Sequence, residues 1–312
     1  MPFDPAEVAR LIADNMSKTG LPFPAPRDVA YSWAKDLNLP SKGSPMLYTG
    51  ALYQLTPYIV SLVGYTSRLE GSSLSSFALK LSRYVPSAVL GATLRPREEM
   101  RVYVERVLKS IVKLLERSGI RPAYAYEDDM YSGTLLYDLG LDELFAEQAR
   151  KVFKALKARG AQEVITVDPH TTHILRSVYP KYVEGFDLSV KSYLEVVSPS
   201  SSPQKGEAVL HDPCLYARFE NVVEQPRRLL EGAGYKVLEP RRSRRTTYCC
   251  GGPIEGLAPK MAKKIAKVRL AELSEKSLLV VTMCPICYVN LVEVANKERV
   301  EDIAILLWGE VG

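Results

Sequence analysis

The chain has 312 residues, of which 46% are hydrophobic and 25% are charged, and its formal net charge is +5. These values are typical of a globular protein with one large or two medium domains. No basic face interleaved with aromatic residues is present, so we expect no nucleic-acid binding. No apolar run approaches the ~20 residues that span a bilayer, and residues 1–4 do not begin a secretory signal, so a cytoplasmic location is expected.

The first part of the chain, residues 1–45, is predicted to be helical and then extended. Pro22, Pro24 and Pro26 interrupt any helix, because proline removes a backbone donor and fixes φ. A short helix is expected over 27–37, and from Met46 the pattern becomes α/β. Residues 67–118 are predicted to be mostly helical, with amphipathic spacing at Val102, Val107, Ile111, Leu114 and Leu115.

The remaining elements alternate between strands and helices. Strands are predicted at 163–167, 208–210 and 278–282, and helices at 146–160 and 259–273. Such alternation indicates a parallel sheet with helices on both faces. A polar stretch over 198–206 reads as a linker. We therefore predict an α/β fold with two lobes, residues 46–197 and residues 207–312.

All five cysteines lie in the second of these lobes. They are Cys214, the adjacent pair Cys249 and Cys250, and the Cys-x-x-Cys formed by Cys284 and Cys287. In a reducing compartment clustered cysteines indicate a metal site or catalysis rather than disulfides, and an odd count pairs badly. Five thiolates exceed the four ligands of a simple zinc site, and two adjacent cysteines crowd a single ion, so iron–sulfur is favoured and zinc stays the alternative.

Two glycines follow the adjacent cysteines. Gly251 and Gly252 would let the backbone approach a cluster and offer N–H donors to its sulfides, and a tight turn would need glycine in the same place. Arg241–Arg245 is an arginine-rich run just before the pair. We expect it to be a solvated or partner-facing loop.

The two lobes align with each other as distant copies. Residues 47–53 align with 210–216, residues 131–133 with 249–251, and residues 165–171 with 281–287. In the first lobe 35 residues separate Ser132 from Asp168, and in the second 33 separate Cys250 from Cys284. Three matches in order indicate two repeats of one unit. In the first lobe the cysteine positions are occupied by other residues: Ala51, Tyr131, Ser132, Asp168 and Thr171.

This pattern resembles the cysteine-rich CCG domain family, which includes the B and D subunits of heterodisulfide reductase, iron–sulfur subunits of glycolate and glycerol-3-phosphate oxidoreductases, and lactate-utilisation proteins. The resemblance covers about residues 45–300. It rests on His211-Asp212-Pro213-Cys214, Pro226-Arg227, Cys249-Cys250-Gly251-Gly252 and Cys284-Pro285-Ile286-Cys287. Residues 15–33 resemble the segment that follows a ferredoxin module in fused members. Members usually carry two CCG motifs, and this sequence has one, as in subunits of membrane complexes from sulfur-metabolising microbes.

The resemblance implies two pseudo-symmetric Rossmann-like lobes in a tandem CCG architecture. It also implies a non-cubane [4Fe-4S] cluster on Cys214, Cys249, Cys250, Cys284 and Cys287, in an oxidoreductase subunit that reduces or forms a disulfide or persulfide. Electrons would come from a ferredoxin-type or flavin-containing subunit, because no Gly-x-Gly-x-x-Gly or Walker loop is present. A place beside a membrane complex is a further implication. The alternatives are an electron-relay subunit of a lactate- or glycolate-type dehydrogenase and a zinc-stabilised structural subunit.

Several other polar residues have more than one interpretation. His211 could donate a proton to a leaving thiolate or could cap a strand end beside Asp212. His170 and His173 with Asp168 could bind a metal or form a hydrogen-bonded loop. Arg218 and Arg227 could hold an anionic group or form a surface pair. The acidic run Glu127-Asp128-Asp129 is expected to be a solvated turn.

Overall fold

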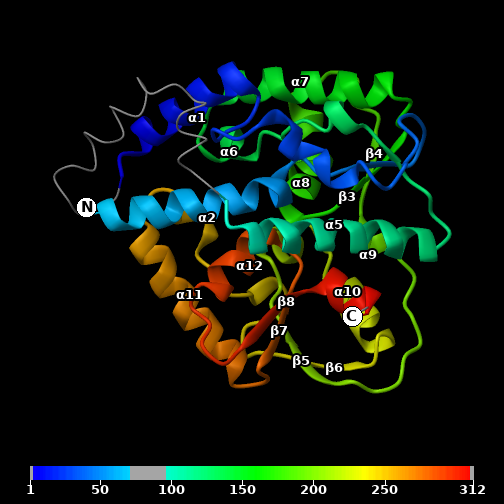
Figure 1. The fold of residues 1–312 in the computed structure, drawn as a ribbon, viewed down its shortest axis with the longest axis vertical. Helices are drawn as coiled ribbons and strands as arrows, with labels where there is room; N and C mark the ends of the chain where they lie inside the picture. Colours follow the sequence, from blue (N-terminus) through cyan, green and yellow to red (C-terminus); the bar gives the residue numbers. More distant parts are fainter. Residues whose placement is uncertain (1–2, 71–95, 310–312) are drawn as a thin grey trace.

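The computed structural model describes residues 3–70 and 96–309 and shows two lobes, each built on a parallel four-stranded sheet. In Figure 1 the first lobe lies above the second, and helices α2 and α5 run across the molecule between them. The predicted α/β class and the pair of pseudo-symmetric lobes are therefore confirmed. The exact lobe limits, 46–197 and 207–312, stay a prediction.

The first sheet has the strand order β2-β1-β3-β4. The elements up to the end of this lobe are α1 (Pro5–Thr19), η1 (Arg27–Ala30), η2 (Ser32–Ala34), β1 (Met46–Tyr48), α2 (Leu52–Leu69), α5 (Glu98–Arg117), β2 (Ala123–Tyr124), η3 (Tyr126–Asp128), α6 (Thr134–Asp138), α7 (Asp142–Ala158), β3 (Glu163–Thr166), α8 (Pro169–His173), η4 (Ile174–Val178), η5 (Tyr179–Lys181), β4 (Ser189–Ser192) and α9 (Tyr193–Val196).

The second sheet repeats this arrangement with the order β6-β5-β7-β8. Its elements are β5 (Gly206–Leu210), η6 (Tyr216–Glu220), α10 (Glu224–Gly232), β6 (Tyr235–Leu238), η7 (Arg244–Thr246), η8 (Gly252–Ile254), α11 (Pro259–Ser274), β7 (Leu279–Thr282), α12 (Pro285–Val292), β8 (Arg299–Asp302) and α13 (Ile303–Trp308).

The register of the two sheets agrees with the sequence alignment of the two lobes. Leu47 of β1 lies opposite Ile165 of β3, and Leu210 of β5 lies opposite Val281 of β7. These are the residue pairs that the alignment equates. Both third strands also end in the same way, because α8 and α12 each begin with proline behind an extended residue, Asp168 or Cys284. Proline suits this first helical position because its fixed φ matches the helix.

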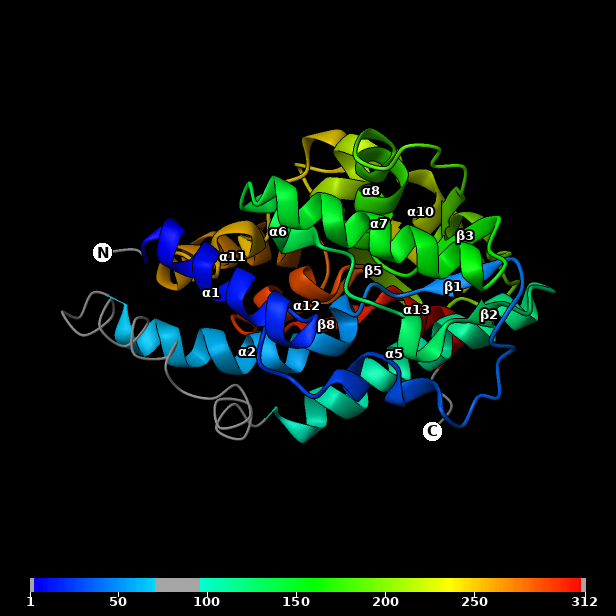
Figure 2. The same ribbon diagram turned by 90° about the horizontal axis from the view of Figure 1, so that it is seen from above.

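Alternate residues of each strand enter different cores, as the pleat of a strand requires. In β1, Met46 and Tyr48 pack against α7, whereas Leu47 packs into a core that contains residues of both sheets. Leu210 and Val281 of the second sheet enter that same core. Seen from above in Figure 2, α7 and α5 lie on opposite sides of β1. The lobes are thus joined by one apolar interior, with α5 and α13 packed together within it.

Two of the predicted helices differ from the structure, and part of one lies outside the described residues. The expected helix over 67–118 becomes the end of α2 and α5, and residues 71–95 are outside the described residues. The expected helix over 27–37 is two short 3₁₀ turns. Among the described residues no helix combines the length and the apolar character that crossing a membrane requires.

Candidate metal centre

The five cysteines come from three loops at the carboxyl edge of the second sheet. Cys214 follows β5, Cys284 follows β7 as the N-cap of α12, and Cys287 lies in the first turn of that helix. Cys249 and Cys250 lie between η7 and η8. The crevice beyond the carboxyl ends of adjacent parallel strands is where open α/β sheets bind ligands. The amino end of α12 also favours thiolate over thiol.

Side-chain interactions link the five sulfurs into one continuous series. Cys214 interacts with Cys249, Cys249 with Cys250, Cys250 with Cys287, and Cys287 with Cys284. All five are free thiols. Cys250, Cys284 and Cys287 are at most 4% exposed, whereas Cys214 and Cys249 are partly exposed. The site therefore has a closed side, and an open side formed by Cys214 and Cys249.

The surroundings favour thiolate at two of the five positions. Hydrogen bonds from the Cys214 and Cys250 thiols and from the backbone of Gly251 lower the pKa of Cys249. Burial opposes ionisation of Cys284, but interactions with Cys287 and His170 outweigh it and hold the pKa of Cys284 well below its usual value. Because metals bind thiolates, this charge distribution fits a soft metal centre.

The backbone after the cysteine pair supports the same site. The N–H groups of Gly251 and Gly252 lie 3.3 and 3.4 Å from the sulfurs of Cys249 and Cys250. Gly251 has φ +94°, and a Cβ on Gly252 would lie 2.4 Å from Cγ2 of Ile286. Both glycines are therefore required by conformation or by space.

His211 lies beside the closed side of this centre. Its side chain and the thiols of Cys250 and Cys287 place their ligand atoms within 4.8 Å of one another. Nδ1 of His211 accepts a hydrogen bond from Nε of Arg269 at 3.0 Å, and Nε2 is buried without a partner. Burial, followed by the charge of Arg269, lowers the pKa of His211 to about 3. The role of His211 as a proton donor stays a prediction.

The loops that carry the cysteines are braced by Asp212. Its carboxylate accepts two hydrogen bonds from Arg227, each of 2.9 Å, and a third from the backbone N–H of Arg244 at 2.7 Å. Its carbonyl accepts from Thr247 Oγ1 at 2.8 Å. The loop before Cys249 is thereby fixed to the loop before Cys214. The surface pair expected for Arg227 was wrong, because this side chain is buried between Asp212 and Glu239.

The first lobe fills the space where its own cysteines would be. Ala51, Tyr131, Ser132, Asp168 and Thr171 are all 0% exposed. The hydroxyl of Tyr131 accepts from the N–H of Leu135, and Asp168 caps α8 by accepting from the N–H groups of His170 and Thr171. These residues form a buried interior at the positions where the second lobe has cysteines, and Oδ2 of Asp168 has no hydrogen-bond partner among the described residues.

The same lobe covers the closed side of the cysteines. Ala51, Leu52 and Tyr131 belong to one apolar cluster with Cys250, Cys284 and Cys287. The side chain of His170 also interacts with Cys284, an inter-lobe contact that the sequence did not reveal. Burial alone would lower the pKa of His170, but Cys284, Asp168 and Asp138 raise it to about 9.

The histidines of the first lobe do not form the metal site considered for them. Within the described residues, three side chains lie close enough together to bind one metal ion through their ligand atoms. They are His211, Cys250 and Cys287. His173 instead pairs with Glu220 at 2.6 Å. The interpretation of Asp168, His170 and His173 as a hydrogen-bonded loop is the one that agrees with these contacts.

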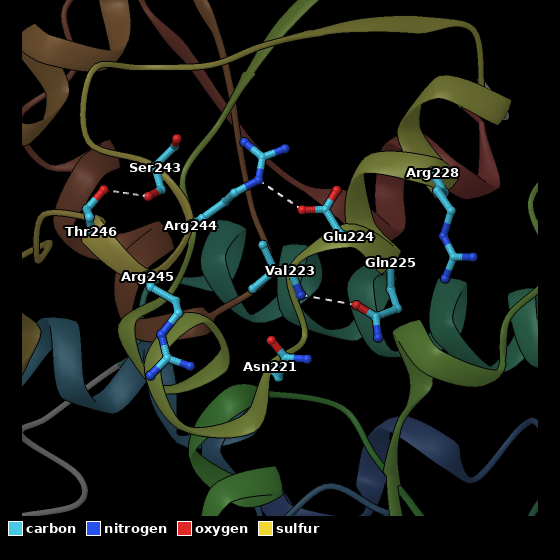
Figure 3. A pocket seen from close by; sticks show the side chains of 9 residues that line it. All are labelled: Asn221, Val223, Glu224, Gln225, Arg228, Ser243, Arg244, Arg245 and Thr246. Atoms are coloured by element: carbon cyan, nitrogen blue, oxygen red, sulfur yellow. Dashed lines mark hydrogen bonds and ion pairs between the residues drawn. The ribbon is translucent and has the colours of Figure 1, made fainter.

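An open basic pocket of about 570 Å³ lies beside the loop that leads to the cysteine pair. Figure 3 shows Arg228, Arg244 and Arg245 around it, with Arg244 directed at Glu224. That ion pair measures 2.9 Å. Within the part of the chain that the structure describes, the side chains of Arg228 and Arg245 make no hydrogen bond or ion pair. The pocket therefore presents two unneutralised guanidinium groups to solvent.

Sequence reasoning missed Arg269 and Asp129. Arg269 occupies a buried position in α11 together with Ala262, Ala266 and Leu273, so an arginine on the apolar stripe was a signal available in the sequence. Asp129, expected in a solvated turn, is 1% exposed and accepts hydrogen bonds from Thr49 and Tyr124. No periodic signal marks that residue.

Comparison of the sequence with known proteins identifies a matching domain family and several relatives. Residues 208–292 match the CCG family, described as a cysteine-rich domain. The chain is 26% identical over 210 residues to the probable iron-sulfur-binding oxidoreductase FadF of Bacillus subtilis, covering 64% of this chain and 30% of that protein. It is 27% identical over 228 residues to the EtfAB:quinone oxidoreductase of Syntrophomonas wolfei, covering 65% and 32%.

A third relative is one of the subunits of the fumarate reductase (CoM/CoB) of Methanothermobacter marburgensis. That match is 27% identical over 157 residues and covers 47% of this chain and 31% of the fumarate reductase polypeptide. The chain thus spans about a third of the length of the curated relatives it matches. All five cysteines lie within the segment, residues 208–292, that matches the CCG cysteine-rich domain.

Proposed function

We propose that the chain is an iron–sulfur subunit of a redox complex that acts on a disulfide or persulfide. The observation that carries this proposal is the series of five sulfurs, closed on the side of Cys250, Cys284 and Cys287 and open at Cys214 and Cys249. Five converging thiols with backbone N–H donors exceed what one tetrahedral ion needs. The relatives named as iron–sulfur-binding and quinone oxidoreductases support the redox part.

The donor set fits a [4Fe-4S] cluster held by Cys214, Cys249, Cys250, Cys284 and Cys287. Such a cluster would supply one-electron steps at a potential that depends on burial and hydrogen bonds. Reductive cleavage of a disulfide consumes two electrons and two protons and yields two thiols. The protein's own contribution is to expose Cys214 and Cys249 to a sulfur substrate and to exclude water at the opposite side with Ala51, Leu52 and Tyr131.

The electron donor in this proposal is a ferredoxin-type or flavin-containing subunit with an acidic surface. The basic pocket supports it, because unpaired Arg228 and Arg245 would meet carboxylates on such a partner. Complementary charge steers weak redox encounters and raises their association rate. The same proposal places the protein in the cytoplasm, either bound to the surface of a membrane complex or separate from such a complex.

Metal analysis of anaerobically purified protein tests the proposal. We expect about four irons and four acid-labile sulfides per chain, the content of one [4Fe-4S] cluster. We also expect an EPR signal that appears on oxidation and changes when a thiol is added. One zinc without sulfide would overturn the redox function and leave a structural subunit. A complete cluster whose EPR spectrum and reduction potential do not change with any added thiol would overturn the disulfide chemistry. The chain would then act as an electron-relay subunit.

A further inference from the structure

Arg269 determines which nitrogen of His211 carries the hydrogen. The Arg269 side chain is fully buried, and its Nε donates to Nδ1 of His211 over 3.0 Å. A guanidinium group has five donors and no acceptor. Nδ1 must therefore be the acceptor in this contact, and a neutral imidazole that accepts at Nδ1 carries its hydrogen at Nε2.

Nε2 of His211 has no hydrogen-bond partner among the described residues, and the side chain lies beside the cysteine centre. This nitrogen is buried, and the ligand atoms of His211, Cys250 and Cys287 lie within 4.8 Å of one another. A buried N–H group without an acceptor is costly, so native proteins almost always give it one. The atoms grouped with the His211 side chain are the sulfurs of Cys250 and Cys287, so a cluster bound there would offer Nε2–H a sulfur as acceptor.

The hydrogen bond at Nδ1 of His211 runs in the opposite direction to the one that a metal-bound histidine makes. A histidine that coordinates a metal through one nitrogen usually donates its other N–H to a carboxylate, a carbonyl or water. His211 receives a hydrogen bond at that second nitrogen from a cation instead. Nε2 consequently has no free lone pair for a metal.

The position of Arg269 is itself fixed by several partners. Its Nη1 donates to the carbonyl of Arg242 at 2.9 Å and pairs with Glu272 at 3.1 Å. Its Nη2 lies 3.5 Å from Oγ1 of Thr247, whose hydroxyl also donates to the carbonyl of Asp212. Arg269 is therefore held by the loop before Cys249 as well as by its own helix.

We propose that Arg269 is a positioning residue that holds His211 as a neutral Nε2–H donor to a sulfur of the cysteine-bound cluster, and that His211 is not a metal ligand. The inference rests on the proposed iron–sulfur function. A hydrogen bond to a cluster sulfur stabilises the added negative charge of the reduced state, so it makes reduction more favourable.

The test compares loaded wild-type protein with His211→Leu, His211→Asn and Arg269→Met by metal analysis and EPR-monitored redox titration. His211→Leu should keep its full iron content while reduction becomes about tenfold less favourable, the fold-change for one hydrogen bond to a charged group. His211→Asn, whose amide can still donate, should recover part of the change. His173→Leu is the matched control, since His173 pairs with Glu220, and it should leave the potential unchanged.

Pulsed EPR on protein labelled with ¹⁵N-histidine gives a second readout, and its first measurement uses the wild-type protein. Wild-type protein should show only the weak nitrogen coupling of a hydrogen-bonded imidazole, and Arg269→Met should change that coupling. A strong coupling from a directly bonded nitrogen that is present in the wild type and lost in His211→Leu would overturn the inference. So would a His211→Leu protein with full iron and an unchanged potential. A wild-type protein without a cluster would instead defeat the proposed function.

Discussion

At the scale of single residues, the two glycines after the cysteine pair have separate reasons to be glycine. Gly251 is required by its backbone conformation, with φ +94°, and by the carbonyl oxygen of Ala262, which would lie 2.5 Å from a Cβ. Gly252 is required by space beside Ile286 and Cys250. The tight turn that the sequence indicates is present, and the approach of these N–H groups to the sulfides of a cluster stays a prediction.

The replacement Gly251→Ala should destabilise the protein by about 2–4 kcal/mol, because a positive φ and a forced backbone contact add their costs. The free energy of unfolding from denaturant titration measures this effect, and the iron content should fall with it. Gly256→Ala is the matched control. A Cβ there meets nothing within 4 Å, so its effect should stay within about 0.5 kcal/mol. Equal effects of the two replacements would contradict the argument.

At the scale of elements, the alignment of the two lobes equates residues that occupy equivalent positions in the two sheets. Leu47 and Leu210 have equivalent neighbours in their sheets, as the alignment required. The strands β1, β2, β4, β6 and β8 were not predicted. β2 has two residues and β6 is only partly buried, so neither shows the apolar alternation by which strands are recognised.

A second element-scale feature is the carboxylate that joins β1 to the segment after β2. Asp129 accepts hydrogen bonds from the N–H groups of Thr49 and Gly50 and from the hydroxyl of Tyr124. Burial raises the pKa of Asp129 to about 6, although these hydrogen bonds oppose the rise. The sequence could not predict this, because the burial of Asp129 arises from packing between segments that are far apart in the chain.

This raised pKa gives a pH dependence of known sign. Between about pH 4 and pH 6 the folded state binds more protons at Asp129 than the unfolded state does, so the stability from this group is lost as pH rises. The loss is at most about 1.4 kcal/mol per pH unit. Asp129→Asn should therefore gain stability relative to the wild type as pH rises through this window, measured as the free energy of unfolding.

The exposed Glu127→Gln replacement is the control for this pH series. It should leave the pH dependence of the wild type unchanged, because Glu127 lies at the surface two residues earlier. A stability difference between Asp129→Asn and wild type that stays constant across the window would show that Asp129 does not titrate there.

At the scale of the whole molecule, the sequence located the cysteine centre in the second lobe but not what encloses it. Ligand spacing and strand order are local properties, and both can be read along the chain. The cover formed by Ala51, Leu52 and Tyr131 depends on how one lobe packs against the other. The lost cysteine positions of the first lobe therefore have a structural role that only the three-dimensional arrangement reveals.

The basic pocket is the part of the surface where binding of an acidic partner would be favoured. Arg245 precedes Cys249 by four residues, so their Cα atoms are at most about 14 Å apart. A partner bound over the basic pocket would thus be close to the open side of the cysteine centre. Ion pairs formed there would be screened as salt is added, since the Debye length shrinks from about 10 Å at 0.1 M to about 3 Å at 1 M.

The double replacement Arg228→Glu and Arg245→Glu should slow electron transfer from a reduced acidic ferredoxin by tenfold or more at low ionic strength, within the range of electrostatic steering. Stopped-flow mixing measures the second-order rate, and the difference should vanish near 1 M salt. Arg241→Glu is the matched control, because Arg241 is exposed in the same loop but does not line the pocket. If Arg241→Glu slowed the reaction as much as the double replacement, net charge and not this pocket would govern the encounter.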